Sequence, residues 1–101
     1  MNFKVKITEQ AEVELDEAYG WIAADSLEQA AHWFNGLVEA CQSLSLNPER
    51  CPRAPESNDI DRDIRQLLYG KYRILFTITD DIVYLLHVRH GARRYLSSEE
   101  V

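Results

Sequence analysis

Apolar residues near the start of the chain recur first at every second position and then at every third or fourth. Phe3, Val5 and Ile7 alternate with lysines, which is the pattern of a half-buried strand. Thr8 follows and can cap the N-terminus of a helix. The apolar positions of that helix are spaced by four, three and four residues: Ala11, Leu15, Ala18 and Ile22. The pattern therefore predicts a strand that leads directly into an amphipathic helix.

A second helix is predicted after a short break. Asp25 with Glu28, or Ser26 with Gln29, has the spacing of a capping box. The apolar face that follows extends to about residue 46. It consists of Leu27, Ala30, Phe34, Leu37, Cys41 and Leu44. Two apolar-faced helices joined by so few residues form an antiparallel hairpin.

Two sets of side chains on these helices are interpreted as structural. The acidic residues of the first helix fall mostly away from its apolar face, so we expect them to form a solvated surface. They are Glu12, Glu14, Asp16 and Glu17. Tyr19, Trp21 and Trp33 could form a ligand box, but aromatic residues at helical spacing beside apolar stripes more often pack in or around the core.

The second half of the chain predicts a long loop and then three strands. Residues 47–61 contain all three prolines, and too little chain follows them for a second core. The predicted strands cover residues 64–69, 71–79 and 82–90, where aromatic and β-branched residues are frequent. We therefore predict one α+β domain over residues 1–101: an N-terminal strand, an antiparallel helical hairpin and a three-stranded antiparallel meander, with the helices on one face of the sheet.

The alternation of side chains assigns the strand residues to two faces. If the last turn has two residues, Arg73 faces Val88, and His90 lies on the same side of the sheet as Arg73. Arg65 also lies on that side if the turn at Gly70 has three residues. A two-residue turn would place Arg65 on the other face.

The two predicted faces differ in polarity. One is apolar and should meet the helices. The other is half apolar and carries Leu67, Leu75, Leu86 and Val88. We expect either the tail, residues 95–101, or another chain to cover it. A partner with apolar side chains and a carboxylate would suit this surface, as would a phosphate held by converging guanidinium groups.

Charge changes the picture because it is unevenly distributed. The 101-residue chain has a formal net charge of −6, which argues against a general nucleic-acid binder. Residues 1–49 carry nine acidic residues and two lysines, whereas all eight arginines come later. One arginine on a strand is usually solvated or salt-bridged, but several that converge predict a site for an anionic group. The candidate site residues are Arg65, Arg73, His90 and Arg93.

The sequence does not support a metal site, a disulfide bridge, a known catalytic motif or a membrane span. His87 and His90 make a weak metal pair, since positions three apart in a strand face opposite ways. Cys41 is interpreted as a core thiol and Cys51 as a loop thiol, with no disulfide bridge between them. No phosphate-binding loop, nucleophile elbow or metalloprotease motif is present. We expect no metal, no cofactor and no membrane span, and, without a signal-peptide pattern, a cytoplasmic location.

The order and spacing of these segments resemble the RelE/ParE superfamily of bacterial toxins, which includes proteins labelled plasmid stabilisation proteins. The resemblance covers nearly the whole chain, through "TEQAEVELDEAYGWI", "SLEQAAHWFNGLVEACQSLSLNP" and "DIRQLLYGKYRILFTITDDIVYLLHVRHGARR". Its most specific parts are Arg65 followed by Tyr72-Arg73-Ile74, and the closing His90-Gly91-Ala92-Arg93. The resemblance implies the toxin of a type II toxin–antitoxin system, a growth inhibitor that a cognate antitoxin wraps in a hetero-oligomer.

Two mechanisms divide this superfamily. RelE-like members are enzymes that cut mRNA in the ribosome, with basic residues and often a C-terminal tyrosine, whereas ParE-like members inhibit DNA gyrase. Carried over by position, Arg73 matches the arginine of the strand after the turn and Arg93 matches the arginine after the last strand. Arg65 stands near the basic positions of the preceding strand.

The tyrosine of the RelE-like members falls on Glu99 in this chain, and Tyr95 is a weaker candidate at a different spacing. Arginine can stabilise the charge of a phosphorane but is a poor proton acceptor, so His90 or Tyr95 would have to supply acid–base catalysis. These features and the acidic net charge favour a ParE-like gyrase inhibitor. The alternatives are a RelE-like mRNA endonuclease acting on the ribosome, and an inactive homologue that serves only as a protein-binding module.

Overall fold

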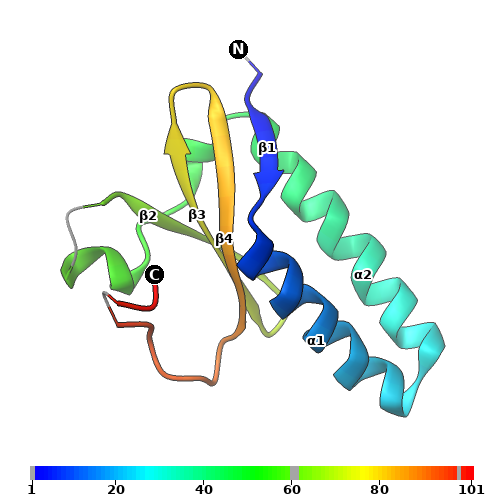
Figure 1. Cartoon of the computed structure of the whole chain (residues 1–101). Coiled ribbons are helices and arrows are strands. Elements are labelled where there is room, and N and C mark those ends of the chain that lie inside the picture. Colours follow the sequence, from blue (N-terminus) through cyan, green and yellow to red (C-terminus); the bar gives the residue numbers. More distant parts are fainter. Residues whose placement is uncertain (1, 60–61, 98) are drawn as a thin grey trace.

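The computed structural model describes residues 2–59, 62–97 and 99–101, and its elements follow the predicted order (Figure 1). The helices are α1 (Glu9–Asp25) and α2 (Leu27–Gln42). The strands are β1 (Lys4–Ile7), β2 (Ile64–Tyr69), β3 (Tyr72–Thr79) and β4 (Ile82–His90). Between α2 and β2 lie three short 3-10 turns, η1 (Ser43–Ser45), η2 (Pro48–Arg50) and η3 (Pro55–Asp59).

The four strands form one sheet in the order β1-β4-β3-β2. β2, β3 and β4 make the predicted antiparallel meander, and β1 pairs with β4 in parallel, so that the sheet is mixed. The two helices lie side by side along one side of the sheet (Figure 1). The α+β fold class is confirmed. Neither described helix is long and apolar enough to cross a membrane.

Two hydroxyl groups set the limits of the helical hairpin. Thr8 Oγ1 accepts a hydrogen bond from the Ala11 backbone N–H (3.2 Å) and donates one to the Leu85 carbonyl (2.8 Å), which fastens the start of α1 to β4. Ser26 is the single residue between the helices, and its Oγ accepts from the Gln29 N–H at 3.1 Å. Of the two possible capping positions, the structure uses Ser26, and one residue reverses the chain.

The second helix ends earlier than predicted, at Gln42 rather than near residue 46. The Ser43 hydroxyl bonds to the Ala40 carbonyl, and the chain tightens into η1, as serine favours near helix ends. Leu44 is nevertheless fully buried, so the apolar pattern continues past the end of the helix. Asn47 then turns the chain with a positive φ of 48°.

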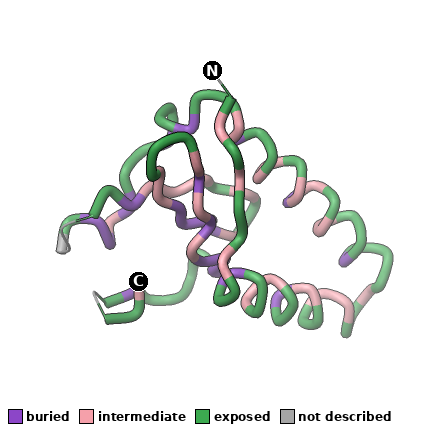
Figure 2. Tube along the Cα trace, turned by 45° about the horizontal axis from the view of Figure 1, so that its top comes forward, coloured by how far each residue is buried: buried purple, intermediate pink, exposed green. Residues whose placement is uncertain are grey.

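The main core lies between the hairpin and the sheet, and buried residues follow the central strands in Figure 2. Its buried members are Ala11, Leu37, Leu44, Cys51, Ile74, Phe76, Val83, Leu85 and Val88. A second, smaller cluster occupies the other face of the sheet. It consists of Ala54, Ile64, Leu75 and Leu96, with Leu86 and Val101 packed against it. The tail therefore folds back over the face that the helices leave open.

A β-bulge in β4 changes the predicted register. Pairing is as predicted from Thr79–Ile82 to Phe76–Leu85, but Leu75 pairs with His87, so β4 has one extra residue. Arg73 consequently pairs with Arg89, not Val88. The prediction that His90 shares a face with Arg73 is wrong, because one extra residue moves every later side chain of the strand to the opposite face.

The turn between β2 and β3 contains two residues, since Tyr69 pairs with Tyr72. Gly70 has a φ of +56° there, a conformation that glycine adopts readily. With this turn, Leu67 pairs with Ile74 and Arg65 pairs with Phe76, so both lie on the helix side. The sequence alone is compatible with either turn length, and the structure selects the alternative that separates Arg65 from Arg73.

These two changes also correct the predicted open surface. Leu67 and Val88 belong to the main core beneath the helices, whereas Leu75 and Leu86 lie under the tail. The expectation that all four share an uncovered face is therefore wrong. The expectation that the tail folds back over part of that face is confirmed for Leu75 and Leu86.

Candidate functional site

Arg73 is buried, with 5% of its surface exposed. Its two terminal nitrogens bind both carboxylate oxygens of Glu56 in η3, at 3.0 and 2.6 Å, and its Nε donates to Gln66 Oε1 at 3.0 Å. The ring of Tyr95 lies 5.1 Å from the guanidinium carbon. The guanidinium group thus already has a bidentate anion and an aromatic cover, both from the chain itself.

Glu56 is the counter-charge of Arg73, and it was not among the predicted site residues. Burial alone would raise the pKa of its carboxyl, but the hydrogen bonds from Arg73 and the Leu96 backbone N–H, together with the charge of Arg73, lower it overall. The Leu96 N–H donates to Glu56 Oε2 at 3.1 Å. One carboxylate therefore ties η3, β3 and the tail together. Its position in a Pro-rich loop gave no periodic signal for this role.

Arg65 fastens the loop before β2. One terminal nitrogen donates to the carbonyls of Glu49 (3.0 Å) and Cys51 (2.7 Å), and its Nε contacts Asp63 at 3.2 Å. Arg89 has a similar role at the tail. It is buried, and it donates twice to the Arg94 carbonyl, at 3.1 and 2.9 Å. Burial, followed by repulsion from Arg93 and Arg94, lowers the pKa of Arg89.

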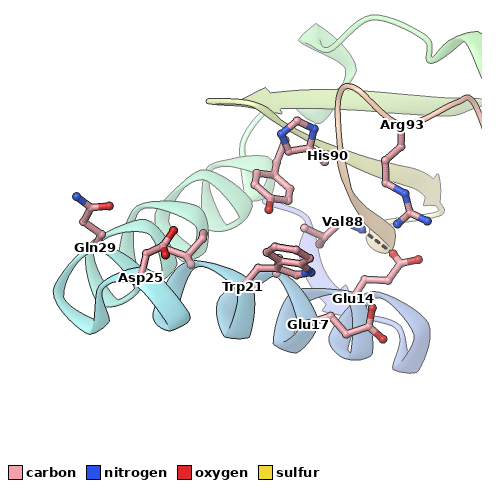
Figure 3. A pocket seen from close by; sticks show the side chains of 11 residues that line it. Glu14, Glu17, Trp21, Asp25, Gln29, Val88, His90 and Arg93 are labelled. Carbon is pink, nitrogen blue, oxygen red and sulfur yellow. Dashed lines mark hydrogen bonds between the residues drawn. The ribbon is translucent and has the colours of Figure 1, made fainter.

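His90 and Arg93 come together on the helix side, where they line a pocket of about 500 Å³ between α1 and the end of β4 (Figure 3). Its lining residues are Glu14, Glu17, Ala18, Trp21, Ile22, Asp25, Gln29, Tyr72, Val88, His90 and Arg93. The ring of His90 stands edge-on to Tyr72, with centroids 5.2 Å apart, and its Nδ1 accepts from the Ala92 N–H at 3.0 Å. Arg93 forms no ion pair with any residue in the described part of the chain.

The structure therefore divides the four predicted site residues among three places. Arg73 lies under the tail, Arg65 holds the loop before β2, and only His90 and Arg93 share a pocket. The expected convergence of all four on one surface is wrong, because the bulge and the two-residue turn redirect the strands. Tyr95 covers Arg73 and is not among the residues that line this pocket.

Glu14 lies at the edge of this pocket and was wrongly assigned to a solvated face. Its carboxylate accepts from the Val88 backbone N–H at 2.9 Å and contacts His87 Nδ1 at 3.0 Å. Burial would raise its pKa, but these bonds, one from Gln10 and the charge of His87 lower it overall. Positions three after Ala11 and four before Ala18 lie on the apolar side of α1, which was the available signal.

The three aromatic residues considered for a ligand box differ in their packing. Tyr19 packs edge-on against Phe34 at 6.0 Å, and Trp33 packs against Tyr72 at 5.1 Å, as predicted for core or rim residues. Trp21 is the exception, because 79% of its surface is exposed beside the pocket. Its interpretation as a packing residue is wrong.

Neither cysteine has the properties of a reactive group. Burial raises the pKa of Cys41 to about 11, and burial also raises the pKa of Cys51 despite the nearby charges of Arg50 and Arg65. Both thiols are unpaired in the structure. His87 turns to Glu14 while His90 lines the pocket, and no group of three metal-binding side chains occurs among residues 2–59, 62–97 and 99–101.

Comparisons with known proteins agree with this fold. A search of curated proteins found no match. A structure of the chromosomal ParDE toxin–antitoxin system from P. aeruginosa is similar, with a TM-score of 0.71 and 18% identity, covering 87% of this chain and 95% of that chain. The toxin–antitoxin complex RelBE2 from Mycobacterium tuberculosis has a TM-score of 0.60 and 23% identity, covering 92% and 95%. At these identities, the likeness establishes the fold alone.

The sequence itself matches a family model over residues 5–95, which is nearly the whole chain. That model describes the ParE toxin of the type II toxin–antitoxin system parDE. The matched part contains α1, α2 and the complete meander, together with His90 and Arg93, the two predicted site residues that line the pocket. The chain therefore belongs to the ParE toxin family of type II toxin–antitoxin systems.

Proposed function

We propose that this chain is the toxin of a toxin–antitoxin pair, and that a cognate antitoxin binds and neutralises it. The observation that carries this proposal is the family match over residues 5–95. Two further observations support it: the similar structures come from a ParDE system and a RelBE2 toxin–antitoxin complex. In bacteria, the chain would arrest growth when it is present without its antitoxin.

We further propose that the target is DNA gyrase, because the sequence features favour a ParE-like gyrase inhibitor. A ribonuclease would need several cations around one phosphate to stabilise the phosphorane. Here the guanidinium of Arg73 binds Glu56, and that of Arg65 binds main-chain carbonyls. Among the predicted site residues, His90 and Arg93 alone line a common pocket. This geometry supports a protein target over an RNA phosphate.

One observation favours a second candidate, an mRNA endonuclease. His90 lies in the same pocket as Arg93, and an imidazole can act as acid or base near neutral pH. The pair supplies one proton-transfer group and one cation, two of the groups that cleavage by 2′-OH attack requires. Neither the Arg73 cation nor Tyr95 contributes to this arrangement, since they stack on each other elsewhere.

The test combines growth and target assays. The wild-type chain should arrest bacterial growth, induce a DNA-damage response and impair supercoiling by purified gyrase. Arg93→Ala should relieve arrest while remaining folded, because the Arg93 side chain is exposed. Arg73→Ala is unsuitable for this purpose, since it leaves Glu56 buried without its counter-charge.

Other outcomes select the alternatives. Rapid mRNA cleavage on ribosomes, lost in His90→Ala, would establish the endonuclease and reject gyrase. Normal growth at high soluble expression would reject the active toxin, and it would favour an inactive homologue that only binds a partner.

A further inference from the structure

The pocket beside His90 has two ends of different chemistry (Figure 3). Arg93 reaches towards one end, near Glu14, whose carboxylate is already bound to β4. Asp25 and Gln29 lie at the other end, and Trp21 lies between the two ends on α1. This second end contains aromatic and acidic groups and no basic side chain from α1 or α2.

The helical period explains how these groups gather. Glu17, Trp21 and Asp25 are each four residues apart, so they lie in one row along α1. A carboxylate consequently stands one turn before the indole ring, and another stands one turn after it. Neither carboxylate forms an ion pair with another described residue.

Trp21 is exposed in a way that needs an explanation. A tryptophan buries roughly 150–250 Å² when it packs, and leaving it in water forfeits that stabilisation. Trp21 is 79% exposed although Trp33, on the neighbouring helix, packs on the sheet. Exposed tryptophans beside a concave surface are common anchors in protein interfaces.

The electrostatic field at this end favours a cation. Asp25 is the last residue of α1, and the last turn contains no basic residue. Glu17 lies towards the Arg93 end, so Asp25 supplies the carboxylate here, while the partial charges of the α1 carbonyl end and of the adjoining amino end of α2 oppose each other. An aromatic face beside carboxylates is the arrangement that attracts an ammonium or guanidinium group.

We propose that Trp21 and Asp25 bind an arginine or lysine side chain of the antitoxin, with the cation over the indole face. This inference rests on the proposed function, which supplies the antitoxin as partner. Charge complementarity supports a basic segment at this place, because residues 1–49 carry nine acidic residues and two lysines. The chain's own tail does not fill the site, since Leu96 and Val101 pack on the opposite face of the sheet.

The first experiment tests the chemistry of the site without the antitoxin. The probe is N-acetyl-arginine methylamide, and its neutral isostere N-acetyl-citrulline methylamide is the control. In NMR titrations of the full chain, the indole N–H signal of Trp21 should shift with the arginine probe and not with citrulline. The Trp33 signal should stay in place, because that ring packs against Tyr72.

Matched variants then assign the binding groups. Asp25→Asn should weaken probe binding about two- to fivefold, the effect of one exposed ion pair. Asp16→Asn makes the same charge change on the opposite side of α1, and it should leave binding unchanged. Equal shifts with both probes, or equal losses in both variants, would overturn the cation site.

The second experiment uses the antitoxin, taken as the product of the reading frame adjoining the gene. Trp21→Ala should weaken its binding at least about tenfold, as for an interface anchor, and Leu27→Ala, a similarly exposed position off the pocket, should not. Tight binding that both variants retain would overturn the inference and leave the proposed function standing. Absence of binding to the wild type would instead reject the pairing, and self-association lost in Trp21→Ala would identify a second copy as the occupant.

Discussion

Two glutamates, Glu14 and Glu56, each join segments that lie far apart in the sequence. Glu14 connects α1 to β4 through the Val88 N–H and His87, 74 and 73 positions away. Glu56 connects η3 to Arg73 in β3 and to the tail. Both carboxylates are held by charge-assisted hydrogen bonds, and the loss of either should affect stability more than a typical surface substitution.

The buried pair of Arg73 and Glu56 gives the first prediction. Arg73→Ala leaves a buried carboxylate without its partner, so it should lower the free energy of unfolding by about 3–5 kcal/mol. Urea denaturation followed by circular dichroism measures the change. The double variant Glu56→Leu with Arg73→Met should recover most of the loss, because it removes both charges. A single variant as stable as the wild type would mean that the pair is solvated.

The second prediction concerns the acid dependence of Glu14. Its pKa in the folded chain lies below its ordinary value of 4.5, so its stabilisation is present above about pH 5 and is lost as the pH falls through the folded pKa. Glu14→Gln should therefore lower the free energy of unfolding by about 1–3 kcal/mol at neutral pH and by less in acid. Denaturation midpoints measured from pH 7 to pH 3 test this. The exposed Glu12→Gln provides the control, and a constant difference across the range would contradict the assignment.

At the scale of elements, the hairpin, the meander and the helix caps could be predicted from the sequence. They depend on local periodicity and on single residues such as Thr8 and Ser26. The extra residue of β4 left no comparable signal, since apolar and aromatic residues follow one another from Val83 to Leu86 and hide the break in the alternation. One such bulge was enough to separate His90 from Arg73. The site was therefore less predictable than the fold, because a face assignment fails completely when the register shifts by one residue.

The tail gives the third prediction, also at this scale. Leu96 is 7% exposed and packs with Leu75 and Ile64 on the face that the helices leave open. Leu96→Ala should lower the free energy of unfolding by about 2 kcal/mol, the lower end for a buried leucine near a chain end. Hydrogen exchange should accelerate at the Leu96 amide, which is bound to Glu56. The exposed neighbour substitution Ser97→Ala should change neither quantity, and an equally silent Leu96→Ala would show that the tail is not docked.

At the scale of the whole molecule, the acidic N-terminal half of the chain and the arginine-containing C-terminal half both contribute to one pocket. The acidic helix α1 forms one wall, and the end of β4 with Arg93 forms the other. A partner segment in this pocket would therefore need a basic side chain towards Asp25 and an acidic one towards Arg93. Such a bipolar arrangement fixes the direction of a bound chain, since the reversed segment would place like charges together.

The last prediction follows from this polarity. Binding of the antitoxin should raise the melting temperature of the toxin, because a ligand that binds only the folded state stabilises it. Arg93→Glu should reduce that rise by reversing the charge at one end of the pocket. Lys4→Glu, an equal charge change at the exposed start of β1, should preserve it. Differential scanning fluorimetry at matched antitoxin concentrations measures both. If the two variants reduce the rise in melting temperature equally, the effect comes from net charge alone, and the antitoxin does not bind in this pocket.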